Sequence, residues 1–159
     1  MYRNLRRKDR IMSDEDVQRV LKENSHGVLA TVSEDGSPYA NPVSYVWYKD
    51  AIWFHSASQG HKVENIAGDS RVAFTIIGKV DMLRPKPEVY FESVIVFGKC
   101  EKVTEYERQV EGMVELMKIF MPDKVHETKD DLVNMSKAIH VYRIVPEHIT
   151  GKIRKPKDS

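Results

Sequence analysis

Cysteine and long hydrophobic runs are both scarce in this sequence. Cys100 is the single cysteine among 159 residues, which excludes an intrachain disulfide and any zinc site that needs two thiolates from one chain. No aliphatic or aromatic run exceeds four residues, as at 94–97, whereas a membrane-spanning helix needs about 20. The basic start of the chain leads into an acidic stretch at 14–16 instead of an apolar segment. We therefore expect no secretory signal, no membrane association and a cytoplasmic protein.

A charge excess of one sign is also missing. The 25 basic and 24 acidic side chains give a net charge of +1, which is too balanced to indicate nucleic-acid binding, so we expect no such partner. The charge is nevertheless uneven, because residues 1–10 carry +4, residues 151–159 carry +3 and the stretch between them carries −6. These basic terminal segments, about 1–12 and 151–159, could bind an anion or a partner subunit, or could be solvated chain ends.

Hydrophobic periodicity and turn signals predict a single domain over residues 1–159, mainly β with peripheral helices. Strands are expected at 27–32, 39–48, 52–55, 71–77, 91–103 and 139–145. Helices are expected at 13–24 behind an N-capping Ser13, briefly after Lys62, behind a capping box at Thr104, and at 130–137. Because strands and helices do not alternate strictly, six strands favour an antiparallel barrel over a doubly wound parallel sheet.

Three prolines or proline-rich stretches refine this prediction. Pro42 lies inside the second expected strand, which indicates an edge or bulge position, since proline cannot donate to a strand ladder. Residues 78–90, with Pro85 and Pro87, predict an irregular excursion. Pro146 is expected to end the last strand.

The polar chemistry of the chain is concentrated at residues 54–62. This segment leaves an expected strand, turns at Gly60 and opens a short helix, with Ser56, Ser58 and two histidines along it. A helix N-terminus offers free N–H groups to an anion, and Lys62 adds a positive charge. The set suits a phosphate monoester. A solvated polar loop is the alternative, because the segment is neither a Walker loop nor a dinucleotide-binding glycine motif.

Metal and hydrolase chemistry find little support. The six histidines show no pair with the helical spacing of a zinc protease, so we expect no metal site. The sequence also has no G-x-S-x-G motif, which is the strongest sign of a serine hydrolase.

Five stretches together resemble a known family. They are Arg6-Arg7 and residues 38–46, 54–62, 90–99 and 147–152. In this order they are similar to the flavin-binding split-barrel superfamily of pyridoxamine 5′-phosphate oxidase, and most similar to its 5-nitroimidazole-resistance branch. The resemblance implies a six-stranded antiparallel split β-barrel of the Greek-key, FMN-binding type. It also implies a homodimer with two FMN sites between its subunits.

The same resemblance implies which residues would bind FMN. The backbone from Asn41 to Tyr45 would run beside the flavin ring, and a second group would hold the phosphate. The expected cofactor-binding residues are Asn41, Pro42, Val43, Ser44, Tyr45, His55, Ser56, Ala57, His61, Lys62, Glu92 and Ser93. Of these, Ser93, with Glu92 beside it, would reach the flavin of the opposite subunit.

The implied activity is that of a flavin-dependent oxidoreductase. Electrons would pass from NADH or NADPH to FMN and then to a small acceptor such as a nitroaromatic compound. No catalytic side chain is predicted, because the flavin supplies the redox chemistry. His55 could donate a proton near the flavin or contact the phosphate. A flavin- or haem-binding protein without turnover, and a deazaflavin in place of FMN, remain alternatives. Pyridoxamine phosphate oxidation is not expected, since no matching C-terminal substrate-binding segment is found.

Overall fold

The computed structural model describes residues 2–3, 5–83, 88–125 and 139–155. The strands are β1 (His26–Val32), β2 (Pro38–Ser44), β3 (Val46–Tyr48), β4 (Ala51–Ala57), β5 (Arg71–Leu83), β6 (Glu88–Lys102) and β7 (Ile139–Arg154). The α-helices are α1 (Asp14–Glu23), α2 (His61–Gly68) and α3 (Tyr106–Phe120), with short 3-10 turns η1 (Lys8–Arg10) and η2 (Pro122–Lys124). None of these helices is long and apolar enough to cross a membrane.

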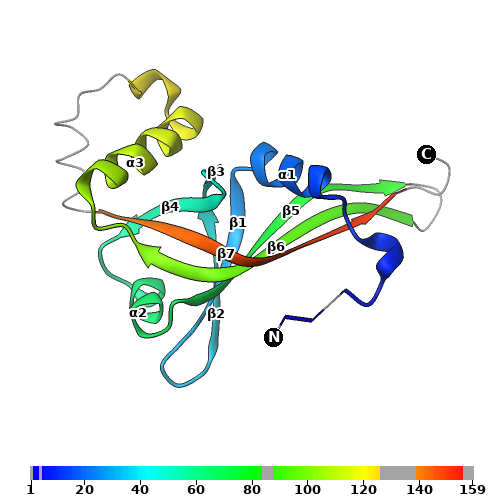
Figure 1. Ribbon diagram of the computed structural model, residues 1–159, viewed down its shortest axis with the longest axis horizontal. Coiled ribbons are helices and arrows are strands. Elements are labelled where there is room, and N and C mark those ends of the chain that lie inside the picture. The colour runs from blue at the N-terminus through cyan, green and yellow to red at the C-terminus, as the bar shows by residue number, and fades with distance from the viewer. Residues whose placement is uncertain (1, 4, 84–87, 126–138, 156–159) are drawn as a thin grey trace.

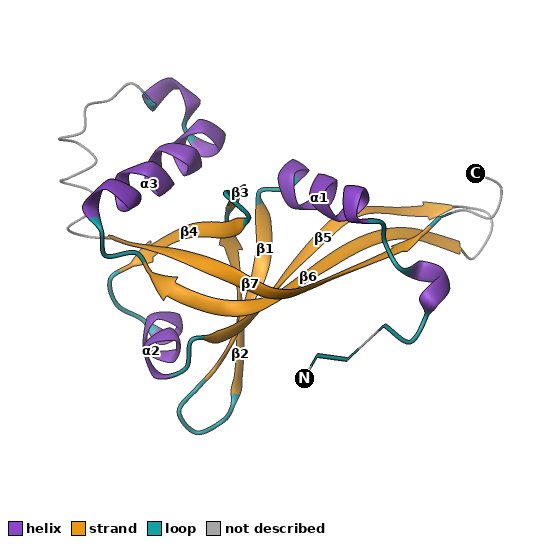
Figure 2. Cartoon of the chain, in the orientation of Figure 1, coloured by secondary structure: helices purple, strands orange, loops and turns teal. Residues whose placement is uncertain are grey.

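The strands form one antiparallel sheet in the order β2-β1-β5-β6-β7-β4-β3. The sheet curls into a half-barrel, with the helices at its periphery (Figures 1 and 2). β5, β6 and β7 continue together beyond the barrel as an extended arm, and α1 lies beside them. The fold is therefore mainly β and consistent with a split barrel, as the sequence predicts.

The strand count of six is wrong, because the expected strand at 39–48 breaks at Tyr45. The backbone N–H of Tyr45 donates to the Ser25 carbonyl and its hydroxyl donates to the Leu21 carbonyl, 2.9 Å away, inside the core. The break gives a seventh strand and places β2 and β3 at opposite edges of the sheet. The expected edge position of Pro42 is confirmed, since β2 is an edge strand.

The predicted excursion at 78–90 is also wrong at both ends. β5 runs through Gly78 as far as Leu83, and β6 begins at Glu88. Only residues 84–87, which include both prolines, lie outside the described chain. The ladder absorbs the glycine through a register shift between Ile77 and Val80. A bulge inside a long pairing thus replaces the expected irregular segment.

Pro146 does not end the last strand either, since β7 continues to Arg154. Pro146 lies opposite Gly98, where the pairing of β6 and β7 shifts register. Proline is tolerated at such a bulge because the ladder hydrogen bond is already lost there. Gly98 is required at this bulge, because a Cβ there would collide with the Val145 carbonyl oxygen. Residues 151–154 of the basic C-terminal segment therefore belong to the sheet.

The helix predictions are confirmed for α1 and in part for α3. Ser13 caps α1, since its hydroxyl accepts from the Asp16 backbone N–H at 3.1 Å. The capping box at Thr104 does not form, because Glu105 occupies the N-cap position of α3 and no side chain caps it. The helix expected at 130–137 lies outside the described residues.

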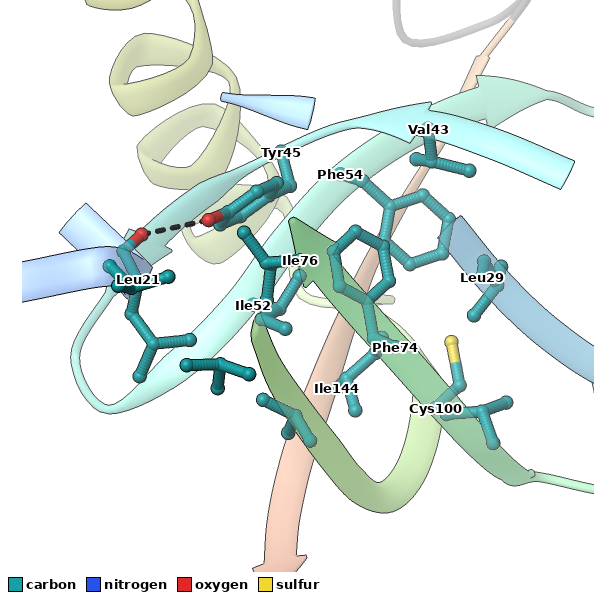
Figure 3. Packing of buried hydrophobic residues seen from close by; sticks show 14 of the residues in the cluster. Leu21, Leu29, Val43, Tyr45, Ile52, Phe54, Phe74, Ile76, Cys100 and Ile144 are labelled. Atoms are coloured by element: carbon teal, nitrogen blue, oxygen red, sulfur yellow. Dashed lines mark hydrogen bonds between the residues drawn. The ribbon is translucent and has the colours of Figure 1, made fainter. Parts of the chain in front are cut away.

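Two hydrophobic clusters hold these elements together. The first lies inside the curled sheet and includes Leu29, Phe54 and Phe74 (Figure 3). It also contains Cys100, and burial raises the pKa of this thiol to about 12. The second cluster packs α3 against the opposite face of β4, around Trp53. The first four residues of β4 are thus buried on both faces. This packing holds the strand in place up to its C-terminal end at His55–Ala57.

Candidate functional site

The end of β4 and the start of α2 form the candidate site. β4 ends on His55, Ser56 and Ala57, and Gly60 then takes the N-cap position of α2 with φ of 126°. That conformation is readily adopted by glycine and strained for other residues. Because glycine has no side chain, α2 has no side-chain cap. The amide N–H groups of His61 and Lys62, which have no intrahelical acceptor, stay available to an anion, whereas those of Val63 and Glu64 donate to the Gly60 carbonyl.

Lys62 brings a positive charge to this junction, and it acts electrostatically on the His55 imidazole. His55 is an exposed residue, and Lys62 is half-buried in the first turn of α2. The pKa of His55 lies below its ordinary value, because its surroundings partly desolvate it and the Lys62 ammonium acts on it. The junction therefore combines positive potential with free backbone donors, which is the chemistry that a phosphate needs.

His61 points elsewhere, although it precedes Lys62 in the sequence. Its Nε2 lies 2.8 Å from the Ser33 Oγ at the end of β1, and its ring lies 4.2 Å from the Tyr39 ring. Asn65 of α2 extends this contact by donating to the Thr31 hydroxyl at 2.9 Å. His61 thus joins α2 to the β1–β2 hairpin.

A cavity of about 990 Å³ lies between this hairpin and α2. Its lining includes His61 and the carboxylates of Glu34, Asp35, Glu64 and Asp69. An acidic lining opposes the binding of a phosphate dianion. The predicted phosphate-binding group is consequently divided: Lys62 acts on His55, whereas the His61 imidazole contacts Ser33 and Tyr39 of the hairpin.

The predicted ring-binding segment alternates between the two faces of β2. Asn41 pairs with the fully buried Leu29, so its side chain shares the core face. Pro42 and Ser44 take the outer face, while the Tyr45 side chain is buried in the core. Only backbone atoms, Pro42 and Ser44 are thus presented to a ligand outside the barrel. The Oδ1 atom of Asn41 is buried and has no hydrogen-bond partner among the described residues.

Glu92 and Ser93 also face opposite sides of their strand. The Glu92 carboxylate is buried and lies 2.6 Å from Arg19 Nη2, and it accepts from the Tyr90 hydroxyl and the Lys79 backbone N–H. Burial alone would raise the pKa of Glu92, but these donors hold it below its ordinary value. Its oxygens are thus used within the chain, whereas Ser93 lies on the outer face beside Ile77 and Lys152.

Sequence reasoning missed the contacts of His61 with Ser33 and Tyr39, and the ion pair between Arg19 and Glu92. Each joins residues at least 22 positions apart, and no local motif marks them. Over the described ranges, no three His, Cys, Asp or Glu side chains gather as a metal site.

Comparison with known proteins identifies the family. A family model described as pyridoxamine 5′-phosphate oxidase matches residues 13–153, which is most of the chain. The chain belongs to this family. A comparison with curated proteins gives no match.

Several solved structures share this fold. A protein described as a 5-nitroimidazole antibiotic resistance protein from Bacteroides thetaiotaomicron superposes with a TM-score of 0.77 at 18% identity, over 91% of this chain and 86% of that one. A FAD-binding protein from Mesorhizobium loti gives 0.70 at 21% identity, over 92% and 98%. A FAD- and haem-binding protein from Mycobacterium smegmatis gives 0.72 at 17% identity, over 91% and 72%. At these identities the likeness shows the fold alone.

Replacement of Arg19 by alanine should destabilise the protein by about 2 kcal/mol, since it leaves the buried Glu92 charge without its main partner. The side chains of Glu92 and Arg19 are 3% and 36% exposed, so solvent reduces the cost below that of a fully buried pair. Because the folded-state pKa of Glu92 lies below 4.5, this stabilisation is present above pH 4.5 and is lost as the pH falls through the folded value. Urea unfolding between pH 7 and pH 3 measures both effects.

The matched control is Arg71→Ala, which removes an arginine that pairs with Asp69 and is 80% exposed. This variant should lose no more than about 0.5 kcal/mol. Equal losses in the two variants would contradict the structural role of the Arg19–Glu92 pair.

Proposed function

We propose that this chain is an FMN-dependent oxidoreductase that passes electrons from a reduced nicotinamide to a small acceptor such as a nitroaromatic compound. The observation that carries the proposal is the uncapped N-terminus of α2 beside Lys62 and His55. This arrangement supplies backbone donors and positive charge at one point, and the chain belongs to a family named for a phosphate-bearing substrate. Two proteins with the same fold are described as a 5-nitroimidazole antibiotic resistance protein and a FAD-binding protein, and both descriptions agree with the proposal.

The residues present fit the phosphate of FMN. The amides of His61 and Lys62 and the Lys62 ammonium would donate to the phosphate oxygens, with His55 beside them. When bound, the flavin supplies the hydride and electron chemistry of the reaction. The protein's part is to hold the phosphate, to fix the ring and to keep the His55 proton close to the dianion. His61 would contribute its backbone amide, since its imidazole is held by Ser33.

The outer face of β2 is suited to the ring itself. Pro42 and Ser44 lie on this face, and Pro42 has no N–H group that a neighbouring strand would have to satisfy. A planar ring can therefore approach the backbone of residues 41–45 along an edge strand. Asn41, Val43 and Tyr45 would then act through their backbone atoms, because their side chains face the core.

A homodimer would complete the site. The outer face of the arm carries Ile77, Val80 and Met82, which are 60%, 56% and 63% exposed. Apolar residues that gather on one face at such exposure mark an association surface. Ser93 pairs with Ile77 and belongs to the same face, so a partner docked there would lie against Ser93. We propose that each flavin is shared between two copies of this chain.

A flavin- or haem-binding protein without turnover is the second candidate. The observation that favours it is the fold shared with a FAD- and haem-binding protein. A deazaflavin could also replace FMN, because both would present a phosphate to the start of α2. The colour of the protein separates these candidates.

The purified protein should show the two visible absorption bands of an oxidised flavin, and NADH or NADPH should bleach them under anaerobic conditions. A nitroaromatic compound added afterwards should restore the bands, because it takes up the electrons. A Soret band in place of the flavin bands, or flavin bands that neither nicotinamide bleaches, would contradict the proposed activity.

Lys62→Ala should weaken FMN binding by about 1.5–3 kcal/mol, which is the scale of a hydrogen bond to a charged group. Riboflavin has no phosphate, so its affinity should change little in the same variant. Fluorescence quenching of both ligands measures the difference. Lys22→Ala, which removes an exposed lysine on α1, serves as the control and should leave both affinities unchanged. Equal weakening of FMN and riboflavin by Lys62→Ala would place the phosphate elsewhere.

FMN affinity should rise as the pH falls from 8 to 6. A phosphate dianion beside His55 favours the imidazolium form, so binding is coupled to proton uptake, by at most about tenfold per pH unit for one proton. His55→Gln should flatten this dependence. His61→Gln should keep it, because that imidazole faces Ser33. Titrations of both variants across this pH range decide between the two histidines, and a flat profile in His61→Gln alone would reverse the assignment.

Sedimentation should show a homodimer of twice 18.4 kDa. Ile77→Asp should shift it toward monomer and lower its FMN content together, because the charge would be buried in the interface. Ile119→Asp changes a 43% exposed residue on α3 and should leave the dimer intact. A monomeric Ile77→Asp variant with full FMN content would rule out a shared site.

A further inference from the structure

The two basic ends of the chain meet in one pocket. A cavity of about 540 Å³ lies between the segment around η1 and the end of β7. Arg7 and Arg10 line it from the N-terminal side, and Arg154 and Lys155 line it from the C-terminal side. The cations that the sequence places at opposite ends of the chain therefore face a common space.

The walls of this pocket are anchored to the sheet. Ile11 forms an antiparallel bridge with Lys152, and the Met12 backbone N–H donates to the Gly151 carbonyl at 3.0 Å. The Met12 side chain is buried in the core. These contacts fix the N-terminal segment against β7, so the pocket is built by packed backbone on both sides.

The two carboxylates of the pocket, Asp9 and Asp16, are each paired with an arginine. Asp9 accepts from Arg7 Nε and Nη2 at 2.8 and 2.6 Å, which lowers the pKa of Asp9 to about 2. The Asp16 carboxylate accepts from Arg19, and this contact lowers its pKa as well. In the described part of the chain, Arg10 and Arg154 have no ion-pair partner. The pocket thus keeps uncompensated positive charge.

We propose that this pocket binds the phosphate or pyrophosphate group of a small molecule. Guanidinium groups are the side chains that best match phosphate oxygens. The volume lies in the range of small-molecule sites, about 300–1,000 Å³. Asp9 and Asp16 interrupt the positive surface, which suits a compact anion better than the long phosphate backbone of a nucleic acid. None of the residues assigned to FMN lines this pocket, so the site goes beyond the proposed function.

The group could belong to a dinucleotide or to a free phosphate compound, and calorimetry separates the two. The probes are inorganic pyrophosphate, NAD⁺ and NADP⁺, titrated into the protein as purified. The test variant is Arg10→Gln combined with Arg154→Gln, with Lys155→Gln as a single change beyond the end of β7. Lys22→Gln removes one exposed charge outside the pocket and is the control. Circular dichroism checks that each variant is folded.

Pyrophosphate should bind the wild-type protein, and the double variant should bind it at least about tenfold more weakly, with a smaller loss in Lys155→Gln and none in the control. Binding of NAD⁺ or NADP⁺ with the same losses identifies a dinucleotide as the source, and pyrophosphate binding alone identifies a free phosphate compound. The proposal is overturned if no probe binds, or if the double variant matches the control. It is also overturned if an oligonucleotide binds and pyrophosphate does not displace it. Heat of anion binding is independent of flavin colour, so this test and that of the proposed function fail separately.

Discussion

The single residue between β2 and β3 is the constraint on which the architecture depends. These strands are consecutive in the chain, yet they form the opposite edges of one seven-stranded sheet. Only Tyr45 separates them, so the two edges must meet and the sheet must curl. Curling creates the interior that the first hydrophobic cluster fills. It also leaves β2 as an edge strand whose outer face is turned toward solvent. The hydrogen bond from Tyr45 to Leu21 fixes α1 to the same point.

Local chemistry predicted most of the elements, and long-range pairing decided the rest. Ser13 caps α1, as expected, because the capping signal lies within four residues. Gly78 and Pro146 indicated strand ends but lie at bulges inside long strands. Extended pairing with β6 outweighs the local preference at both positions. Glycine and proline mark positions where a strand is locally weak, whereas the pairing that spans such positions depends on residues distant in the sequence.

The candidate site divides in the same way. The sequence and its family resemblance drew attention to His55 and Lys62, because they flank a glycine turn at the start of a helix. Neither indicated that His61 faces Ser33, or that Arg19 engages Glu92, because those partners come from distant elements. Side chains also alternate between the two faces of β2, so Pro42 and Ser44 lie on the outer face while Asn41 and Val43 lie on the core face. A motif thus predicts which part of the fold a residue belongs to, whereas the register of the sheet decides which way its side chain points.

The burial of Cys100 has a practical consequence. Its thiol is 2% exposed inside the barrel and its pKa is about 12, so almost no reactive thiolate exists at neutral pH. Alkylating reagents can reach the sulfur only when the barrel opens. Because the chain has no other cysteine, the rate of alkylation at this single atom would report the openings that expose the barrel interior. Cys100 therefore serves as a built-in probe of these opening motions, and no cysteine has to be introduced.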